Sequence, residues 1–121
     1  MKEQSAAQWA EIGFLELGVS RIFIRLYDRP DRLIMPRDRF IHLLKRIADD
    51  VTVFSNDPTQ RTLFGDTPDT YAGKAELTRS EKAVRVVLKD KTAFYINRKR
   101  AFDFAEKRCD KCGVTALGDV S

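Results

Sequence analysis

Two stretches of this chain, about 60 residues apart, repeat the same order of residue types, and this internal repeat constrains the fold more than any other feature. The matched segments are Gly13–Leu17 with Gly73–Leu77, Ile22–Asp28 with Val84–Asp90, and Leu33–Arg39 with Phe94–Arg100. The segments that follow also match in the spacing of their apolar residues. We therefore interpret the chain as a duplication of one structural unit, with the differences in spacing absorbed by turns.

Each unit is predicted to be a β-hairpin followed by a helix. In the first copy Ile22, Ile24 and Leu26 alternate with polar or aromatic residues, and a period of two is typical of a strand with one buried face. A turn then leads to a second strand near Arg32–Pro36 and a helix from about Arg37 to Asp50. The expected apolar stripe of this helix is Phe40, Ile41, Leu43, Leu44, Ile47 and Ala48.

The second copy gives the same prediction. A strand is expected at Val84–Lys89 and another at Thr92–Ile96, followed by a helix that begins after the N-cap Asn97 and ends near Arg108. The strand residues expected to be buried in the two copies are Ile22, Ile24, Leu26, Val84, Val86 and Leu88. An aspartate at Leu26 or Leu88 should then unfold the domain, because burying an unpaired carboxylate costs several kcal/mol.

One copy is too small to bury a core alone, so the two copies are expected to pack about a pseudo-twofold axis. The predicted fold class is α+β: a duplicated β-hairpin-helix unit with a mainly antiparallel sheet, forming a single domain over 1–121. The predicted organisation is repeat one at about 12–50, a loop-rich connector at 51–72, repeat two at about 73–110 and a mobile tail at 113–121. Two alternatives stay open: Ala6–Phe14 is a short helix or leads into a strand at Phe14–Leu17, and Val51–Phe54 is a candidate short strand.

Charge is distributed unevenly along the 121 residues, of which 43% are hydrophobic and 33% charged. Residues 20–46 and 79–108 are basic, and the residues between them are acidic, within a net charge of +4. The basic blocks form either solvated faces or a surface for an anionic partner. No apolar run approaches the roughly 20 residues of a membrane span, and no apolar signal region follows Met1, so we expect a cytoplasmic protein without membrane association.

Cations and aromatic rings alternate on the outward face of the first strand. Cations follow a phosphate backbone, and aromatic rings stack on unpaired bases for about 1–3 kcal/mol each. The predicted nucleic-acid contacts on strands are Arg21, Phe23, Arg25 and Tyr27 in the first copy and Arg85, Lys89 and Tyr95 in the second. The predicted phosphate contacts at the helix starts are Arg37, Arg39, Arg98 and Arg100. The alternative is that the rings pack beneath another element and the arginines are merely solvated.

No motif in the sequence indicates catalysis. The chain has no Gly-rich phosphate loop, nucleophile elbow or His-Glu-x-x-His run. Cys109 and Cys112 have Cys-x-x-Cys spacing, but zinc needs four ligands, which a homodimer of this chain would have to supply. We interpret both as ordinary thiols outside any disulfide framework. No enzyme activity, cofactor or bound metal is therefore expected.

Strands followed by one helix and repeated at about 60 residues resemble the PUR-repeat and Whirly group of single-stranded nucleic-acid binders. The segments that carry the resemblance are Ile22–Asp28 with Leu33–Ile47, and Val84–Asp90 with Phe94–Arg108. The likeness is architectural and has no diagnostic motif, and the first copy has three strands where those repeats usually have four. The resemblance implies that the outward face of the sheet binds a single strand.

Two functions are compatible with these observations. The first is a small basic regulatory module that binds nucleic acid, single-stranded in particular, with affinity that falls steeply with salt. The second is a protein-interaction module, such as a phage-type inhibitor or adaptor, that recognises an acidic host protein and extends its sheet through a hairpin edge.

Overall fold

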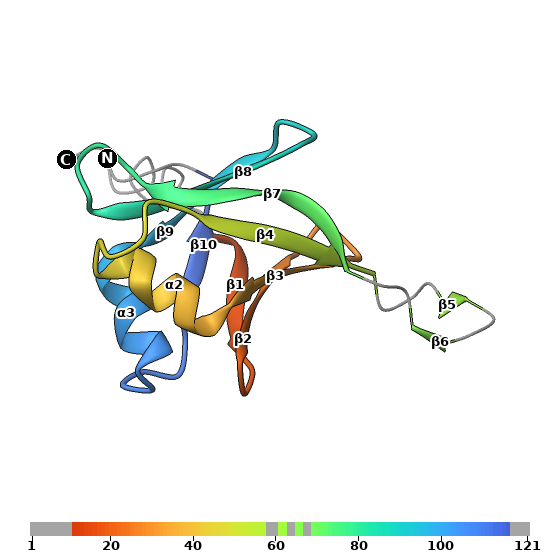
Figure 1. Cartoon of the computed structure of the whole chain (residues 1–121), viewed down its shortest axis with the longest axis horizontal. Helices are drawn as coiled ribbons and strands as arrows, with labels where there is room; N and C mark the ends of the chain where they lie inside the picture. The colour runs from red at the N-terminus through yellow and green to blue at the C-terminus, as the bar shows by residue number, and fades with distance from the viewer. Residues whose placement is uncertain (1–10, 58–60, 63–64, 67–68, 117–121) are drawn as a thin grey trace.

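The computed structural model of this chain describes residues 11–57, 61–62, 65–66 and 69–116 (Figure 1). The strands are β1 (Glu11–Leu17), β2 (Arg21–Leu26), β3 (Arg32–Pro36), β4 (Val51–Asn56), β5 (Arg61–Thr62), β6 (Gly65–Asp66), β7 (Thr70–Leu77), β8 (Ala83–Leu88), β9 (Ala93–Asn97) and β10 (Gly113–Thr115). The helices in this part of the chain are α2 (Arg37–Leu44) and α3 (Arg98–Ala105).

The main strands close into one antiparallel barrel in the order β1-β10-β9-β8-β7-β4-β3-β2. The predicted fold class, an α+β duplication of a hairpin and a helix, is therefore wrong: the described chain is mostly strand, and each helix has only 8 residues. The predicted unit lacked the strand before each hairpin and the strand after each helix. Those strands pair the backbone groups that a lone hairpin leaves free at its edges, and the closed barrel has no free edge.

β1 confirms the alternative of a strand at Phe14–Leu17, and β4 confirms the candidate strand at Val51–Phe54, whereas β10 lies where a mobile tail was expected. β4 lies in the predicted connector and pairs with β3 and β7, and β10 lies in the predicted tail and pairs with β1 and β9. The short strands β5 and β6 form a separate hairpin that projects from the barrel (Figure 1). The rest of the predicted tail, and residues 6–10 of the candidate N-terminal helix, lie outside the described residues. Among the described helices, none is long and apolar enough to cross a membrane.

Apart from the irregularities in β1 and β7, alternate residues of the barrel strands point into a common core. The predicted burial of six strand residues is confirmed, with exposures of 0–5% for Ile22, Ile24, Leu26, Val84, Val86 and Leu88. The helices α2 and α3 contact each other at one end of the barrel and contribute Phe40 and Phe104 to the same core (Figure 1). The strands therefore have one face toward the core and one toward solvent, which places every outward residue on the barrel surface.

Two glycines permit close pairing of neighbouring strands at matching places in the barrel. A Cβ added to Gly13 would lie 2.2 Å from the carbonyl oxygen of Arg25, and one added to Gly73 would lie 2.2 Å from that of Val87. Register shifts occur in β1 beside Gly13 and in the β4–β7 pairing beside Gly73. A side chain at either position would push apart the two strands that need to be adjacent.

Both helices end earlier than the sequence predicted. Arg46 and Lys107 adopt a φ of 64°, and their backbone N–H groups bond to Leu43 and Phe104. The next N–H in each case reaches back to the last turn, which completes a Schellman motif. Ile47, expected in the apolar stripe of α2, therefore lies beyond the helix and is 67% exposed.

The predicted start of the second helix is confirmed. The side-chain oxygen of Asn97 accepts a hydrogen bond from the backbone N–H of Arg100 at 3.0 Å, as an N-cap does. No side chain caps α2, which follows Pro36.

Candidate nucleic-acid interface

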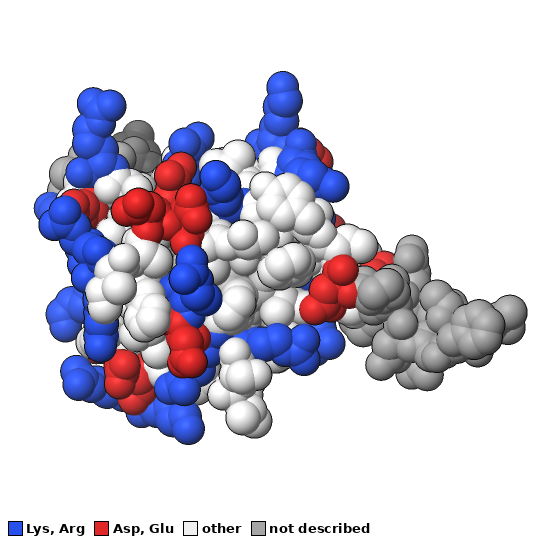
Figure 2. All heavy atoms as spheres, in the orientation of Figure 1, with Lys and Arg blue, Asp and Glu red and all other residues white. Residues whose placement is uncertain are grey.

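Four neighbouring strands carry a continuous row of apolar side chains on the outer surface of the barrel. The row, named here the apolar row, comprises Phe23 on β2, Ile34 on β3, Phe54 on β4 and Tyr71 on β7, each paired in register with the next. At the usual spacing between strands the row extends for about 14 Å across the sheet. Figure 2 shows an uncharged surface over β4 and its neighbours β3 and β7, with Lys and Arg side chains along much of its border and Asp or Glu side chains at its right-hand edge.

Exposure differs along the apolar row, lowest at Ile34 and highest at Tyr71. Ile34 is 3% exposed and forms its floor, Phe23 and Phe54 are half-buried, and Tyr71 is 47% exposed. Phe23 lies beneath the guanidinium groups of Arg21 and Arg32 and keeps part of its surface exposed, so the predicted alternative, that the rings pack beneath another element, applies to it only in part. The row therefore presents ring surface to solvent at three of its four positions.

Cations lie against both ends of the apolar row. The guanidinium carbons of Arg21 and Arg32 lie 5.3 and 4.7 Å from the centre of the Phe23 ring. At the other end, the ammonium of Lys89 lies 5.8 Å from the centre of the Tyr71 ring. Because attraction to the ring holds each cation close to the apolar surface, rings and positive charge are presented together.

Acidic residues neutralise only part of this charge. Arg21 forms an ion pair with Asp69 at 3.7 Å, and Arg25 forms one with Glu16 at 3.4 Å. All four side chains are more than a third exposed, so water and salt weaken both pairs. Both arginines can therefore exchange these carboxylates for another anion at little cost.

The other half of the barrel carries a matching row of a different character. This second row, named here the polar row, comprises Arg85 on β8, Tyr95 on β9, Thr115 on β10 and Glu11 on β1, again paired in register. The predicted contacts Arg21 and Arg85 thus lie on strands four places apart in a ring of eight, on opposite sides of the barrel. The structure does not bring the predicted strand contacts of the two copies together, except that Lys89 reaches the apolar row at Tyr71.

Tyr27 lies just beyond the end of β2 and is 64% exposed. Its ring lies 6.0 Å from that of Phe14, and its hydroxyl donates a hydrogen bond to a carboxylate oxygen of Glu11 at 3.1 Å. This hydrogen bond to Glu11 raises the pKa of the Tyr27 hydroxyl. Tyr27 thus belongs to the border with the polar row rather than to the apolar row.

The predicted phosphate contacts at the helix starts divide into two kinds. Arg37, at the start of α2, donates to the backbone oxygen of Ala105 at the end of α3 at 2.8 Å. Arg98, at the start of α3, donates to the backbone oxygen of Leu44 at the end of α2, also at 2.8 Å. These two arginines therefore fasten the helices to each other, and the phosphate contact predicted for them stays a prediction. The other two, Arg39 and Arg100, are exposed.

The two cysteines are free thiols. Cys112 is buried, and burial raises the pKa of its thiol to about 12. Cys109 is half-buried and its thiol donates to the backbone oxygen of Lys111 at 3.4 Å. Across the described residues, no group of three or more His, Cys, Asp or Glu side chains is placed to hold a metal ion.

Sequence reasoning missed Arg32 and most of the apolar row. Phe54 follows the buried residues Val51 and Val53 with the period of two that indicates a strand, and this signal could have identified it as an outward residue. Tyr71 gives no such signal, because the pairing irregularity at Gly73 interrupts the alternation in β7.

Comparisons with protein-family models, with curated proteins and with solved structures give no match. The likeness to PUR-repeat and Whirly proteins therefore stays a prediction from the sequence.

Proposed function

We propose that this protein binds single-stranded nucleic acid across the β2–β3–β4–β7 side of its barrel. The observation that carries the proposal is the contrast between the two rows: Phe23, Ile34, Phe54 and Tyr71 on one side, and Arg85, Tyr95, Thr115 and Glu11 on the other. Folding requires only the inward residues to be apolar. An apolar outer row on one side alone therefore indicates a surface that binds another molecule. A cytoplasmic location belongs to the same proposal.

In this proposal the strand crosses the β-strands along the apolar row. The half-buried ring of Phe54 and the exposed ring of Tyr71 stack on bases. Arg21 and Arg32 contact the phosphates or stack through their planar guanidinium groups, and the ammonium of Lys89 contacts a phosphate. Neither mode depends on base identity, so we expect weak sequence preference. Arg25 remains within the proposed surface beside Phe23, and Arg85 and Tyr95 fall outside it.

The proposal is tested by titrating a labelled oligothymidylate and measuring fluorescence anisotropy at two salt concentrations. If about three phosphates are contacted, the dissociation constant should rise roughly tenfold or more between about 50 and 200 mM salt. Absence of binding at the lower concentration would reject nucleic acid as the ligand.

A matched pair of tyrosine variants locates the surface. Tyr71→Ala should weaken binding by roughly 5- to 150-fold, the loss expected for one stacked base. Tyr71→Phe should keep most of the affinity, because its ring remains. Tyr95→Ala, in the polar row, is the control and should bind like the wild type. Equal losses in Tyr71→Ala and Tyr95→Ala would place the binding surface elsewhere.

A protein-interaction module is the second candidate, favoured by two exposed aliphatic residues. Val19, in the turn between β1 and β2, is 99% exposed, and Ile47 is 67% exposed. Extension of a partner's sheet by this barrel is disfavoured, because every strand of the barrel already pairs with two neighbours. Val19→Ser should reduce capture of an acidic protein from lysate and leave oligonucleotide binding unchanged, whereas unchanged capture counts against this candidate.

A further inference from the structure

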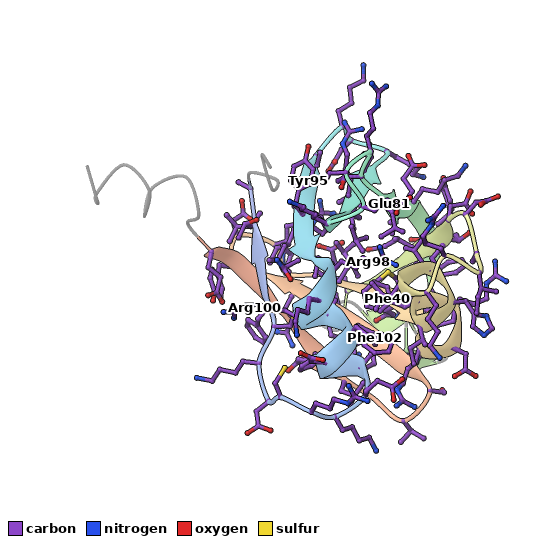
Figure 3. The ribbon with its side chains drawn as sticks, turned by 90° about the vertical axis from the view of Figure 1, so that its left-hand side faces the viewer. Phe40, Glu81, Tyr95, Arg98, Arg100 and Phe102 are labelled. Atoms are coloured by element: carbon purple, nitrogen blue, oxygen red, sulfur yellow. The ribbon has the colours of Figure 1, made fainter. Side chains whose placement is uncertain are left out.

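A cleft of about 640 Å³ lies at the helix end of the barrel, apart from the apolar row on its side. It is bounded by the end of α2, the turn between β7 and β8, and the start of α3. The lining residues are Leu44, Lys45, Glu81, Lys82, Asn97, Arg98, Lys99 and Phe102. Figure 3 shows Arg98 and Phe102 between α3 and α2. Glu81 lies beyond Arg98, and Arg100 lies on the side of α3 away from α2.

The cleft is lined by four cations and one carboxylate. The carboxylate of Glu81 is already engaged, with Arg46 at 3.2 Å and with Arg98 at 4.0 Å. Arg98 is in turn held in place by hydrogen bonds to the backbone oxygens of Leu44 at 2.8 Å and Glu81 at 3.0 Å. The ammonium groups of Lys45, Lys82 and Lys99 add further positive charge. The ammonium of Lys99 lies 3.8 Å from a carboxylate oxygen of Asp103, but the Lys99 side chain is 87% exposed, so water and salt weaken this ion pair and the cleft remains complementary to an anion.

One wall of the cleft is apolar and includes an aromatic ring. Phe102 is half-buried, and Leu44 beside it is buried. The ammonium of Lys45 lies 6.0 Å and the guanidinium carbon of Arg108 5.9 Å from the centre of the Phe102 ring. Helix stability alone does not account for this concentration of cations, because the first turn of α3 is basic and has no acidic residue.

We propose that this cleft binds a phosphate monoester that carries a planar ring, as a nucleoside monophosphate does. The ring lies against Phe102 and Leu44, and the phosphate lies toward Lys82 and Lys99. The volume is within the range of about 300–1,000 Å³ that is typical of small-molecule sites. Such a nucleotide is either free or the phosphorylated end of a strand, and both share this chemistry.

The test is a titration with adenosine 5′-monophosphate, followed by backbone amide shifts in NMR spectra of the full chain. The largest shifts are expected at Asn97, Lys99 and Phe102. Adenosine and inorganic phosphate should each bind at least tenfold more weakly, because each lacks one of the two recognised parts. Shifts confined to other parts of the chain, or equal affinity for adenosine, would overturn the proposal.

Three variants assign the contacts. Lys99→Ala should weaken binding of the monophosphate roughly tenfold, as expected for loss of one charge-assisted contact. Phe102→Leu keeps an apolar side chain packed against the core and should weaken binding of the monophosphate and of adenosine alike. Lys111→Ala, an exposed lysine outside the cleft, should bind like the wild type. A loss in Lys111→Ala equal to that in Lys99→Ala would mean general charge attraction and reject the site.

Two further comparisons separate the sources of the ligand and keep this proposal distinct from the proposed function. The first comparison uses a pentathymidylate with a 5′-phosphate. If the ligand is a strand end, this oligonucleotide should shift the same amides more strongly than its 5′-hydroxyl form does. If the ligand is a free nucleotide, it should shift them no more strongly than the free monophosphate does. Tyr71→Ala should leave binding of the monophosphate unchanged. A loss there would show that the two ligands share the apolar row and that the cleft is not a separate site.

Discussion

At the scale of single residues, two glycines determine how closely the strands approach. Gly73→Ala should lower the free energy of unfolding by at least about 2 kcal/mol, because the new methyl would lie 2.2 Å from the carbonyl oxygen of Val87. Gly113→Ala is the control, since its nearest obstacle is the flexible side chain of Glu11 at 3.0 Å. Urea unfolding of the three proteins measures the difference, and an alanine at position 73 as stable as glycine would contradict the strand pairing.

A second residue-scale prediction concerns alkaline pH. Burial raises the pKa of the Cys112 thiol from 9.0 to about 12, so the thiol stays neutral in the folded protein at a pH where it ionises in the unfolded chain. The resulting stabilisation is complete below pH 9 and is lost as the pH rises from 9 toward 12. Between pH 8 and about pH 10, the free energy of unfolding of the wild type should fall by about 1 kcal/mol more than that of Cys112→Ala. Parallel pH profiles of the two proteins would show that this thiol is not buried.

At the scale of elements, the helix ends offer a direct stability test. Lys107 has a φ of 64° in the Schellman motif that ends α3, a conformation that costs free energy for any residue with a side chain. Lys107→Gly should therefore stabilise the protein by about 0.5–1 kcal/mol in urea unfolding. Lys107→Ala retains the strained backbone and should show no gain. A glycine variant less stable than the alanine variant would contradict the assigned helix end.

Local sequence patterns explain why some elements could be predicted and others could not. Period-two alternation identified β2 and β8 through residues such as Ile24 and Val86, because one face of each is buried. The helices were predicted too long because Arg46 and Lys107 stand where a glycine usually marks the stop. β10 was missed because Gly113–Thr115 is too short to show alternation.

At the scale of the whole molecule, the barrel closes through an uneven set of contacts. Within the described residues, β10 has 3 residues and pairs with β9 only through Thr115 and Tyr95, whereas β4 and β7 pair from Val51 to Ser55. Local opening requires less free energy where fewer hydrogen bonds must break. In hydrogen-exchange mass spectrometry, amides of β10 should therefore exchange faster than those of β4. Slower exchange in β10 than in β4 would contradict the short closing strand.

Closure itself could not be predicted from the sequence. It depends on pairing between Glu11 and Thr115, which are far apart in the chain, and no local pattern specifies such contacts. The candidate surface was predicted only in part for the same reason. Phe23 was identified from its own strand, but its neighbours Ile34 and Phe54 join the apolar row only through the order of the strands in the barrel.

The pairing of β1 with β10 has a consequence for the connectivity of the chain. Because Glu11 and Thr115 are register partners, a short linker between these two regions would join them without crossing the barrel. A circular permutant could then begin and end in the projecting β5–β6 hairpin, outside the barrel. In such a chain every strand of the barrel keeps both neighbours, and the apolar row keeps its register from β2 to β7.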